Sequence, residues 1–216
     1  MSRLQCGVIG LGRFGTAVAT TLLNLGADVI VLDKTEEKAE NFRTTPAIAI
    51  AGDATNELAL REAGIPNCDT VIVAIGKDIE ASILITALLK EMGIPLIVAK
   101  ANDELHGRVL AKIGAHKIIF PERDMGIRTA YSLITSNILD VLELSKDLSI
   151  SEIKTPINIK GKTIKDSKLR ERDKVNLLAI KRNGKIIVNP EPEETIQTDD
   201  TLIIVGKVGD IQRIQK

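Results

Sequence analysis

The stretch Val8-Ile9-Gly10-Leu11-Gly12-Arg13-Phe14-Gly15 decides the fold of this chain. Two apolar residues, typical of the end of a buried strand, lead into the pattern G-x-G-x-x-G. The residues of one helix face follow at i, i+3 and i+4 spacing; they are Phe14, Ala17, Val18, Thr21, Leu22 and Leu25. Strand, glycine turn and helix in this order predict a βαβ unit that binds a nucleotide phosphate.

The three glycines have different expected roles. Gly10 permits the tight turn, Gly12 lets the backbone approach a phosphate, and Gly15 lets the helix pack close to the strand. The helix N-terminus then offers free N–H groups and a positive dipole to an anion. In the alternative, the glycines serve only the packing of an ordinary βαβ unit.

An acidic residue ends the second apolar run. Asp33 stands about 18 residues after Gly15, the position whose carboxylate contacts a ribose diol and repels a 2′-phosphate. We include its neighbour Lys34 among the binding residues.

Strand and helix signals alternate as far as about residue 120. The expected strands are Gln5–Ile9, Asp28–Leu32, Ala47–Ala51, Thr70–Ala74, Leu96–Ala99 and Lys117–Phe120, and the expected helices lie near 13–25, 35–43, 56–64, 79–92 and 104–113. Continuous apolar strands joined by helices predict an α/β fold, a Rossmann-like doubly wound parallel sheet.

The remaining chain predicts a second, small α+β domain. We expect a Rossmann-like domain over 1–137 that includes a crossover helix at 121–137, a linker at 138–148 and a C-terminal domain at 149–216. In the last of these, Asn183-Gly184 between two apolar runs indicates a β-hairpin, and one short charged helix is expected between Ile164 and Arg172.

The helix near 79–92 is apolar around almost its whole circumference, which predicts burial on all sides. We interpret it as a subunit interface; the alternative is burial under a neighbouring helix of the same chain.

Composition excludes several function classes. The formal net charge is +0, and the chain has one Tyr, three Phe and no Trp, so it offers no bulk basic field and few stacking platforms for nucleic acid. No apolar run reaches the length of about 20 residues that a membrane helix needs. The first strand begins too early for a signal peptide, and the two cysteines read as buried residues in a reducing compartment, which together predict a cytoplasmic protein.

Further candidate residues follow the other strands. Asp53 and Ala54 come after the third strand, Ala74, Ile75 and Gly76 after the fourth, and Lys100 after the fifth. Asp53 either contacts the nucleotide or caps the next helix, and an exposed lysine is the alternative for Lys100. Arg13 inside the glycine loop favours a polyphosphate such as ATP or ADP over NAD, because a guanidinium forks onto phosphate oxygens. The alternative for Arg13 is an ordinary solvent-exposed arginine.

Catalytic patterns are missing. The sequence has no nucleophile elbow and no Tyr-x-x-x-Lys pair, and residues 149–216 contain no His, Cys or Tyr. We therefore favour a nucleotide sensor over an enzyme.

Together these motifs resemble a known family. They are Gly10-Leu11-Gly12-Arg13-Phe14-Gly15, Asp33, Gly52-Asp53-Ala54-Thr55, Val71-Ile72-Val73-Ala74-Ile75-Gly76 and Phe120-Pro121-Glu122-Arg123-Asp124-Met125-Gly126. Along essentially its whole length the chain is similar to the cytosolic regulators of bacterial potassium uptake, the KtrA/TrkA type built from regulator-of-K⁺-conductance (RCK) domains. The single copy of each domain resembles the KtrA form.

The resemblance implies a non-enzymatic gating subunit whose dimers form an octameric ring under a K⁺-translocating membrane subunit, at the inner face of the membrane. It implies that ATP or ADP shifts the ring between states, with Arg13 at the phosphates and Asp33 at the ribose. It places Glu122 near a neighbouring subunit's phosphates, where Mg²⁺ or another cation can bridge. It also implies that Arg170 and Asn176 lie where some relatives bind cyclic di-AMP.

Three other functions stay open. The first is a K⁺ transport regulator that binds NAD or NADH in place of ATP, and the second is a small NAD-dependent oxidoreductase. The third, a nucleotide-responsive transcription factor, is disfavoured because no basic patch or helix-turn-helix is evident.

Overall fold

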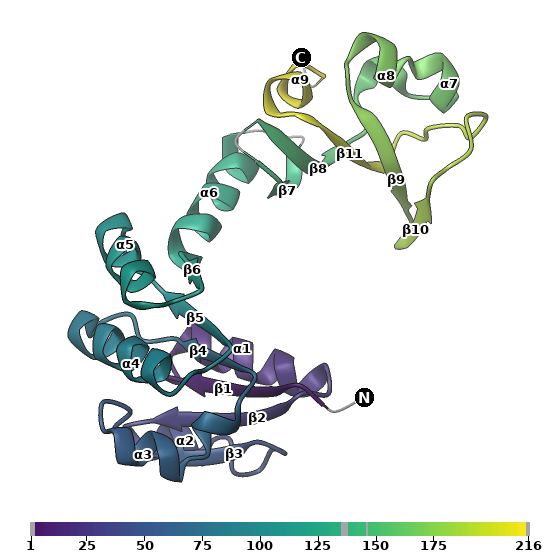
Figure 1. Cartoon of the computed structure of the whole chain (residues 1–216). Coiled ribbons are helices and arrows are strands. Elements are labelled where there is room, and N and C mark those ends of the chain that lie inside the picture. Colours follow the sequence, from purple (N-terminus) through teal and green to yellow (C-terminus); the bar gives the residue numbers. More distant parts are fainter. Residues whose placement is uncertain (1–2, 135–137, 146, 215–216) are drawn as a thin grey trace. The chain divides into compact units, whose positions relative to one another are not determined.

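The computed structural model describes residues 3–134, 138–145 and 147–214. The chain divides into two compact units, Met1–Glu122 and Arg123–Lys216 (Figure 1).

The first unit is built on one parallel sheet. Its strands are β1 (Gln5–Ile9), β2 (Asp28–Asp33), β3 (Ile48–Ala51), β4 (Thr70–Val73), β5 (Leu96–Lys100) and β6 (Lys117–Ile119). They lie in the order β3-β2-β1-β4-β5-β6, and each neighbouring pair is parallel. The predicted Rossmann-like sheet is confirmed, with strand ends that differ by one residue at most. Because the order reverses between β1 and β4, a crevice opens there at the carboxyl edge.

Helices follow the strands as the alternation predicts. They are α1 (Arg13–Asn24), α2 (Glu36–Glu40), α3 (Glu57–Glu62), α4 (Ile79–Glu91) and α5 (Glu104–Ile113), with a 3₁₀ turn at Ile65–Asn67. Three of these helices have a polar N-cap. Asn56, Asp78 and Asp103 accept hydrogen bonds from backbone N–H groups in the first turns of α3, α4 and α5.

The sheet is buried on both faces. Successive residues of a strand point to opposite faces, and Val8 accordingly belongs to a core cluster with Ala19 of α1, whereas Ile9 belongs to one with Ile85 of α4 and Leu110 of α5. This explains why the strands are continuously apolar.

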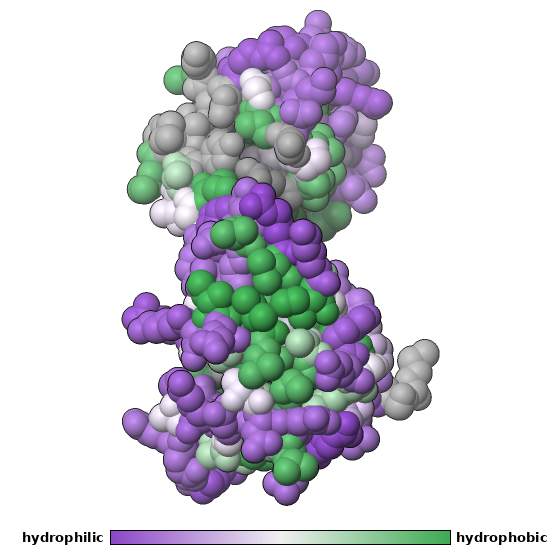
Figure 2. Space-filling model, turned by 60° about the vertical axis from the view of Figure 1, so that its left-hand side comes forward, coloured by the Kyte–Doolittle hydropathy of each residue, from purple (hydrophilic) through white to green (hydrophobic). Residues whose placement is uncertain are grey.

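Helix α4 is covered in part by its own chain. Ser82, Ile85 and Leu89 are buried, and α4 packs against α5, which is the alternative that the sequence left open. Ile79 and Leu84 nevertheless stay exposed, and Figure 2 shows apolar atoms gathered on one face of the first unit. The interface itself stays a prediction.

The second unit begins in α6 (Pro121–Ile134), whose last expected residues, 135–137, lie outside the described part of the chain. An antiparallel sheet in the order β10-β9-β11-β8-β7 follows. Its strands are β7 (Ile138–Glu143), β8 (Leu148–Lys154), β9 (Asn176–Arg182), β10 (Lys185–Val188) and β11 (Thr201–Lys207), and its short helices are η2 (Ile157–Ile159), α7 (Ile164–Ser167), α8 (Leu169–Arg172) and α9 (Val208–Arg213).

Two expectations about this unit need correction. Residues 138–143, expected in a linker, form β7 and pair with β8. The single helix expected between Ile164 and Arg172 is two helices, because Lys168 takes a left-handed conformation with φ 53°. The hairpin is confirmed, with positive φ at both Asn183 and Gly184 as a type I′ turn requires.

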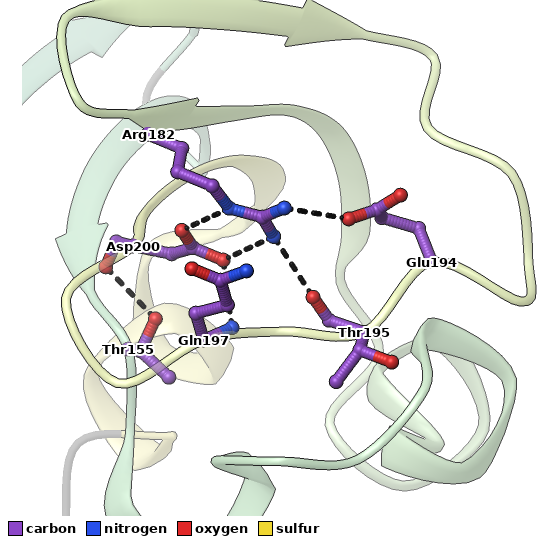
Figure 3. A network of polar contacts seen from close by, with 6 residues as sticks. All are labelled: Thr155, Arg182, Glu194, Thr195, Gln197 and Asp200. Atoms are coloured by element: carbon purple, nitrogen blue, oxygen red, sulfur yellow. Dashed lines mark hydrogen bonds and ion pairs between the residues drawn. The ribbon is translucent and has the colours of Figure 1, made fainter.

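A buried ion pair fixes the loop before β11 (Figure 3). The Arg182 guanidinium donates to both Asp200 carboxylate oxygens at 2.8 and 2.9 Å, to Glu194 at 2.8 Å and to the carbonyl of Thr195 at 2.8 Å. The bidentate geometry gives this contact strength and direction.

Candidate functional site

Two adjoining hollows occupy the carboxyl edge of the parallel sheet, at the reversal of strand order. The smaller measures about 290 Å³ and the larger about 840 Å³, which together suit a small organic ligand. Gly10, Asp33, Ile75 and Asp78 line both. The smaller is otherwise lined by the tips of β2 and β3 and by α4, and the larger by the start of α1, the loop after β4, Lys100, Asn102 and Glu122.

The glycine turn has the geometry that its sequence predicts. Gly10 has φ +94°, a conformation that favours glycine, and a Cβ on Gly15 would lie 1.9 Å from the Gly10 carbonyl oxygen. A Cβ on Gly12 would meet no protein atom within 4 Å. Two glycines are therefore needed by the fold, while the space at Gly12 is open to the larger hollow that Gly12 lines.

The N-terminus of α1 is prepared for an anion. Gly12, the residue before the helix, provides no side-chain cap, and the first turn contains no acidic residue. Arg13 is exposed, lines the larger hollow and has no ion-pair partner in the described part of the chain. Free N–H groups, the helix dipole and this guanidinium all favour a phosphate.

Asp33, at the end of β2, is hydrogen-bonded to the backbone of the glycine turn. It is 7% exposed, and its carboxylate accepts from Leu11 N at 2.6 Å and from Thr35 N at 2.9 Å, with Lys38 Nζ at 3.3 Å. Burial raises the pKa of Asp33, but these hydrogen bonds and the lysine charge outweigh it and hold the pKa below its ordinary value. Asp33 is therefore ionised at neutral pH and keeps acceptor capacity toward a ribose hydroxyl.

The smaller hollow is bounded by the residues after β2 and β3. Lys34, Asp53 and Ala54 line it. Asp53 Oδ1 accepts from the backbone N–H and the hydroxyl of Thr55, so Asp53 forms a turn, and Asn56 caps α3 in its place. No hydrogen bond to the second Asp53 oxygen occurs in the described chain, so that atom can accept from a base or a sugar.

The far wall of the larger hollow carries an ion pair between a buried lysine and an exposed glutamate. Lys100, 9% exposed at the end of β5, donates a hydrogen bond to the Glu122 carboxylate. This hydrogen bond from Lys100 holds the pKa of Glu122 below its ordinary value. Asn102 donates to the carbonyl of Gly76, and so fixes the loop that carries Ala74 and Ile75.

Comparison with known proteins identifies the family. The TrkA-N domain model matches residues 6–121, and the TrkA-C domain model matches residues 150–216. The Ktr system potassium uptake protein C of Bacillus subtilis is 43% identical over 98% of this chain and 96% of its own. The chain belongs to the Ktr/TrkA family of potassium uptake proteins.

Other relatives agree with this Ktr/TrkA assignment. The Ktr system potassium uptake protein A of B. subtilis is 42% identical over 98% of this chain and 95% of its own length. The protein of the same name from Vibrio alginolyticus is 39% identical over 94% of this chain and 92% of its own length. The Ktr/TrkA resemblance inferred from the sequence is thus confirmed.

Solved structures show the same fold. The GsuK RCK domain superposes with a TM-score of 0.69 at 17% identity over 99% of this chain and 47% of its own. The crystal structure of GsuK bound to ADP has a TM-score of 0.52 at 27% identity. The match covers 62% of this chain and 34% of the GsuK chain. The Ktr/TrkA chain thus spans less than half the length of these structures.

In its described residues, no helix is both long and apolar enough to cross a membrane.

Most predicted site residues of this Ktr/TrkA chain line the two hollows, but some do not. Leu11 is buried and contributes its backbone N–H to Asp33. Phe14 and Gly76 line the larger hollow. Arg170 and Asn176 belong to the second unit, in α8 and at the start of β9, and both are exposed.

Sequence reasoning missed three residues of the site. Lys38 faces Asp33, Asp78 caps α4 between the two hollows, and Asn102 holds Gly76. The Asp78 position before an apolar helix is a recognisable capping signal; the other two contacts depend on loop conformation and leave no pattern.

A metal site is not complete within the described residues, because they contain no group of three or more His, Cys, Asp or Glu side chains that could hold an ion. A cation at Glu122 would need oxygen ligands from a nucleotide phosphate or from another subunit.

Proposed function

We propose that this chain is a nucleotide-sensing regulatory subunit of a potassium uptake system and not an enzyme. ATP or ADP binds the first unit, and the bound nucleotide controls a K⁺-translocating membrane subunit. The observation that carries the proposal is the glycine turn, whose open Gly12 position and uncapped helix N-terminus face the same hollow as Arg13 and Lys100.

The choice of ATP or ADP rests on charge. A polyphosphate has more anionic oxygens than the two phosphates of a dinucleotide, and four cationic side chains line the larger hollow: Arg13, Lys38, Lys77 and Lys100. The ADP-bound GsuK structure, 27% identical over the matched part, supports the proposal. No residue between 149 and 216 is His, Cys or Tyr, which supports a regulator in place of an oxidoreductase.

The regulatory step is a population shift. ATP and ADP differ by one phosphate, so only contacts to that group can favour one conformation over the other. Arg13 is the sensor in this proposal, with a cation such as Mg²⁺ at Glu122 between subunits. Dimers assemble into an octameric ring in the cytoplasm and reach the inner face of the membrane through the partner subunit, while Arg170 and Asn176 are the candidates for cyclic di-AMP.

Calorimetry with ATP, ADP and NADH tests the ligand class directly. We expect ATP and ADP to bind more tightly than NADH. Tighter binding of NADH would favour the second candidate, an NAD(H)-responsive regulator, which the buried Asp33 at the ribose position also accommodates.

Variants test the sensor, and native mass spectrometry tests the assembly. Arg13→Ala should change the ratio of ATP to ADP affinity, and an unchanged ratio contradicts the sensing role. The mass of the intact assembly should be that of eight chains with nucleotide bound.

A further inference from the structure

The Lys100–Glu122 ion pair joins two side chains that differ in their exposure to solvent. The Lys100 side chain is 11% exposed and that of Glu122 is 70% exposed. Lys100 is anchored by its buried stem at the end of β5, whereas Glu122 reaches in from the first turn of α6. Of the two, only Glu122 can turn into solvent at low cost.

Lys100 needs an anion, because a buried ammonium without a partner is strongly disfavoured. Glu122 is its ion-pair partner in the described part of the chain. The Lys100 ammonium lies close to the loop after β4: a Cβ built on Gly76 would be 3.1 Å from Nζ. The charge is thus placed against the same loop that lines the larger hollow with Gly10 and Gly12.

The two hollows set the direction in which a nucleotide would lie. The smaller one contains Asp53 and Ala54 and suits a base, and the larger one contains the glycine turn. Lys100 and Glu122 line only the larger one. A phosphate chain that starts at the glycine turn and runs away from the base leads toward Lys100, and its last phosphate comes nearest.

We infer that the last phosphate of a bound nucleoside triphosphate replaces Glu122 as the anionic partner of Lys100, and so releases Glu122 and the first turn of α6. The inference rests on the proposed function and deepens it. Lys100 is a binding residue in this scheme, and Glu122 is a competitor of the phosphate. A nucleoside diphosphate, one phosphate shorter, leaves the ion pair intact.

The consequence for regulation follows from the chain itself. Glu122 is the last residue of the first unit, and Arg123 begins the second. The Lys100–Glu122 ion pair therefore connects the phosphate end of the site to the residue at which the first unit ends. In this scheme ATP breaks the ion pair and ADP does not.

Calorimetry in EDTA tests the exchange with no cation present. Glu122→Gln keeps the shape of the side chain but removes the competing charge, so it should raise ATP affinity about fivefold and change ADP affinity less than about twofold. Lys100→Met keeps the buried stem but removes the charge, and should lower ATP affinity about tenfold more than ADP affinity.

The double variant separates exchange from simple charge repulsion. If Glu122 acts by occupying Lys100, Glu122→Gln should add nothing in the Lys100→Met background. If Glu122 only repels phosphate through space, it should raise ATP affinity about equally in both backgrounds, which would overturn the inference. Glu80→Gln is the matched control, because Glu80 is an exposed acid that lines the smaller hollow without pairing with Lys100.

The remaining outcomes are also decisive. A wild-type protein that binds neither ATP nor ADP contradicts the proposed function and the exchange together. A wild-type protein that binds both, with Glu122→Gln lowering or not changing ATP affinity in EDTA, contradicts the exchange alone. Circular dichroism of each variant confirms that it is folded.

Discussion

Asp33 and Asp200 are both buried aspartates with a lowered pKa, yet their surroundings differ. Asp33 lies in the wall of two open hollows and is held by backbone N–H groups and the half-exposed Lys38. Asp200, 2% exposed, is clamped by the Arg182 guanidinium and accepts from Gln197 N at 2.8 Å. Burial and a lowered pKa therefore do not by themselves mark a candidate binding site, and what distinguishes Asp33 is the open space beside its carboxylate.

The largest expected effect on stability is at the closed site, the ion pair of Asp200 with Arg182. Arg182→Met leaves Asp200 buried without its cation, which should lower the free energy of unfolding of the second unit by about 3 kcal/mol. Urea denaturation measures this loss. Nucleotide affinity should not change, and a parallel loss of affinity would show that the two sites are not independent.

The glycine turn gives a matched pair of variants at the open site, the two hollows lined by Asp33. Gly15→Ala places a methyl group against the Gly10 carbonyl, so it should lower the free energy of unfolding by about 2 kcal/mol. Gly12→Ala meets no protein atom and should cost less than about 1 kcal/mol, yet it should weaken nucleotide binding because its methyl group enters the phosphate space. Denaturation and calorimetry on both variants check this. Equal affinity losses with equal stability losses would contradict the proposed phosphate site.

Asp33→Asn should have a smaller effect on stability. The amide retains one oxygen for Leu11 N but loses the charge that Lys38 and the second N–H favour, so we expect a loss of about 1.5 kcal/mol. Nucleotide affinity should fall as well, in contrast to the Arg182 variant. Thermal melts with and without ATP measure both effects, and an unchanged ATP-induced shift would contradict a ribose contact.

The smallest effect is on pH dependence, and it is shared by the two aspartates. Because folding lowers both pKa values, their stabilisation is present above the unfolded pKa of about 3.9 and is lost as pH falls through the folded values. The urea concentration at the midpoint of unfolding should therefore decrease as the pH is lowered below about 4. Asp200→Asn should flatten part of this fall, and a midpoint independent of pH down to 3 would contradict the assignment.

The open site was largely predictable from sequence because its elements are local. The turn around Gly12 and the strand end at Asp33 follow from glycine spacing and apolar runs. The closed site was not predictable, since Arg182 and Asp200 come from separate elements and meet only through the pairing of β9 with β11. The pairing of Lys100 with Glu122 was missed for the same reason. Strand β7 falls in the expected linker, because the apolar residues after α6 follow without a break that would mark the start of a strand.

The boundary between the two units falls inside the first turn of α6, beside a residue of the larger hollow. The peptide bond between Glu122 and Arg123 joins them directly, and Glu122 is already in contact with the wall of the larger hollow. A change in the backbone at Arg123 is therefore passed directly to a residue that lines the proposed nucleotide site.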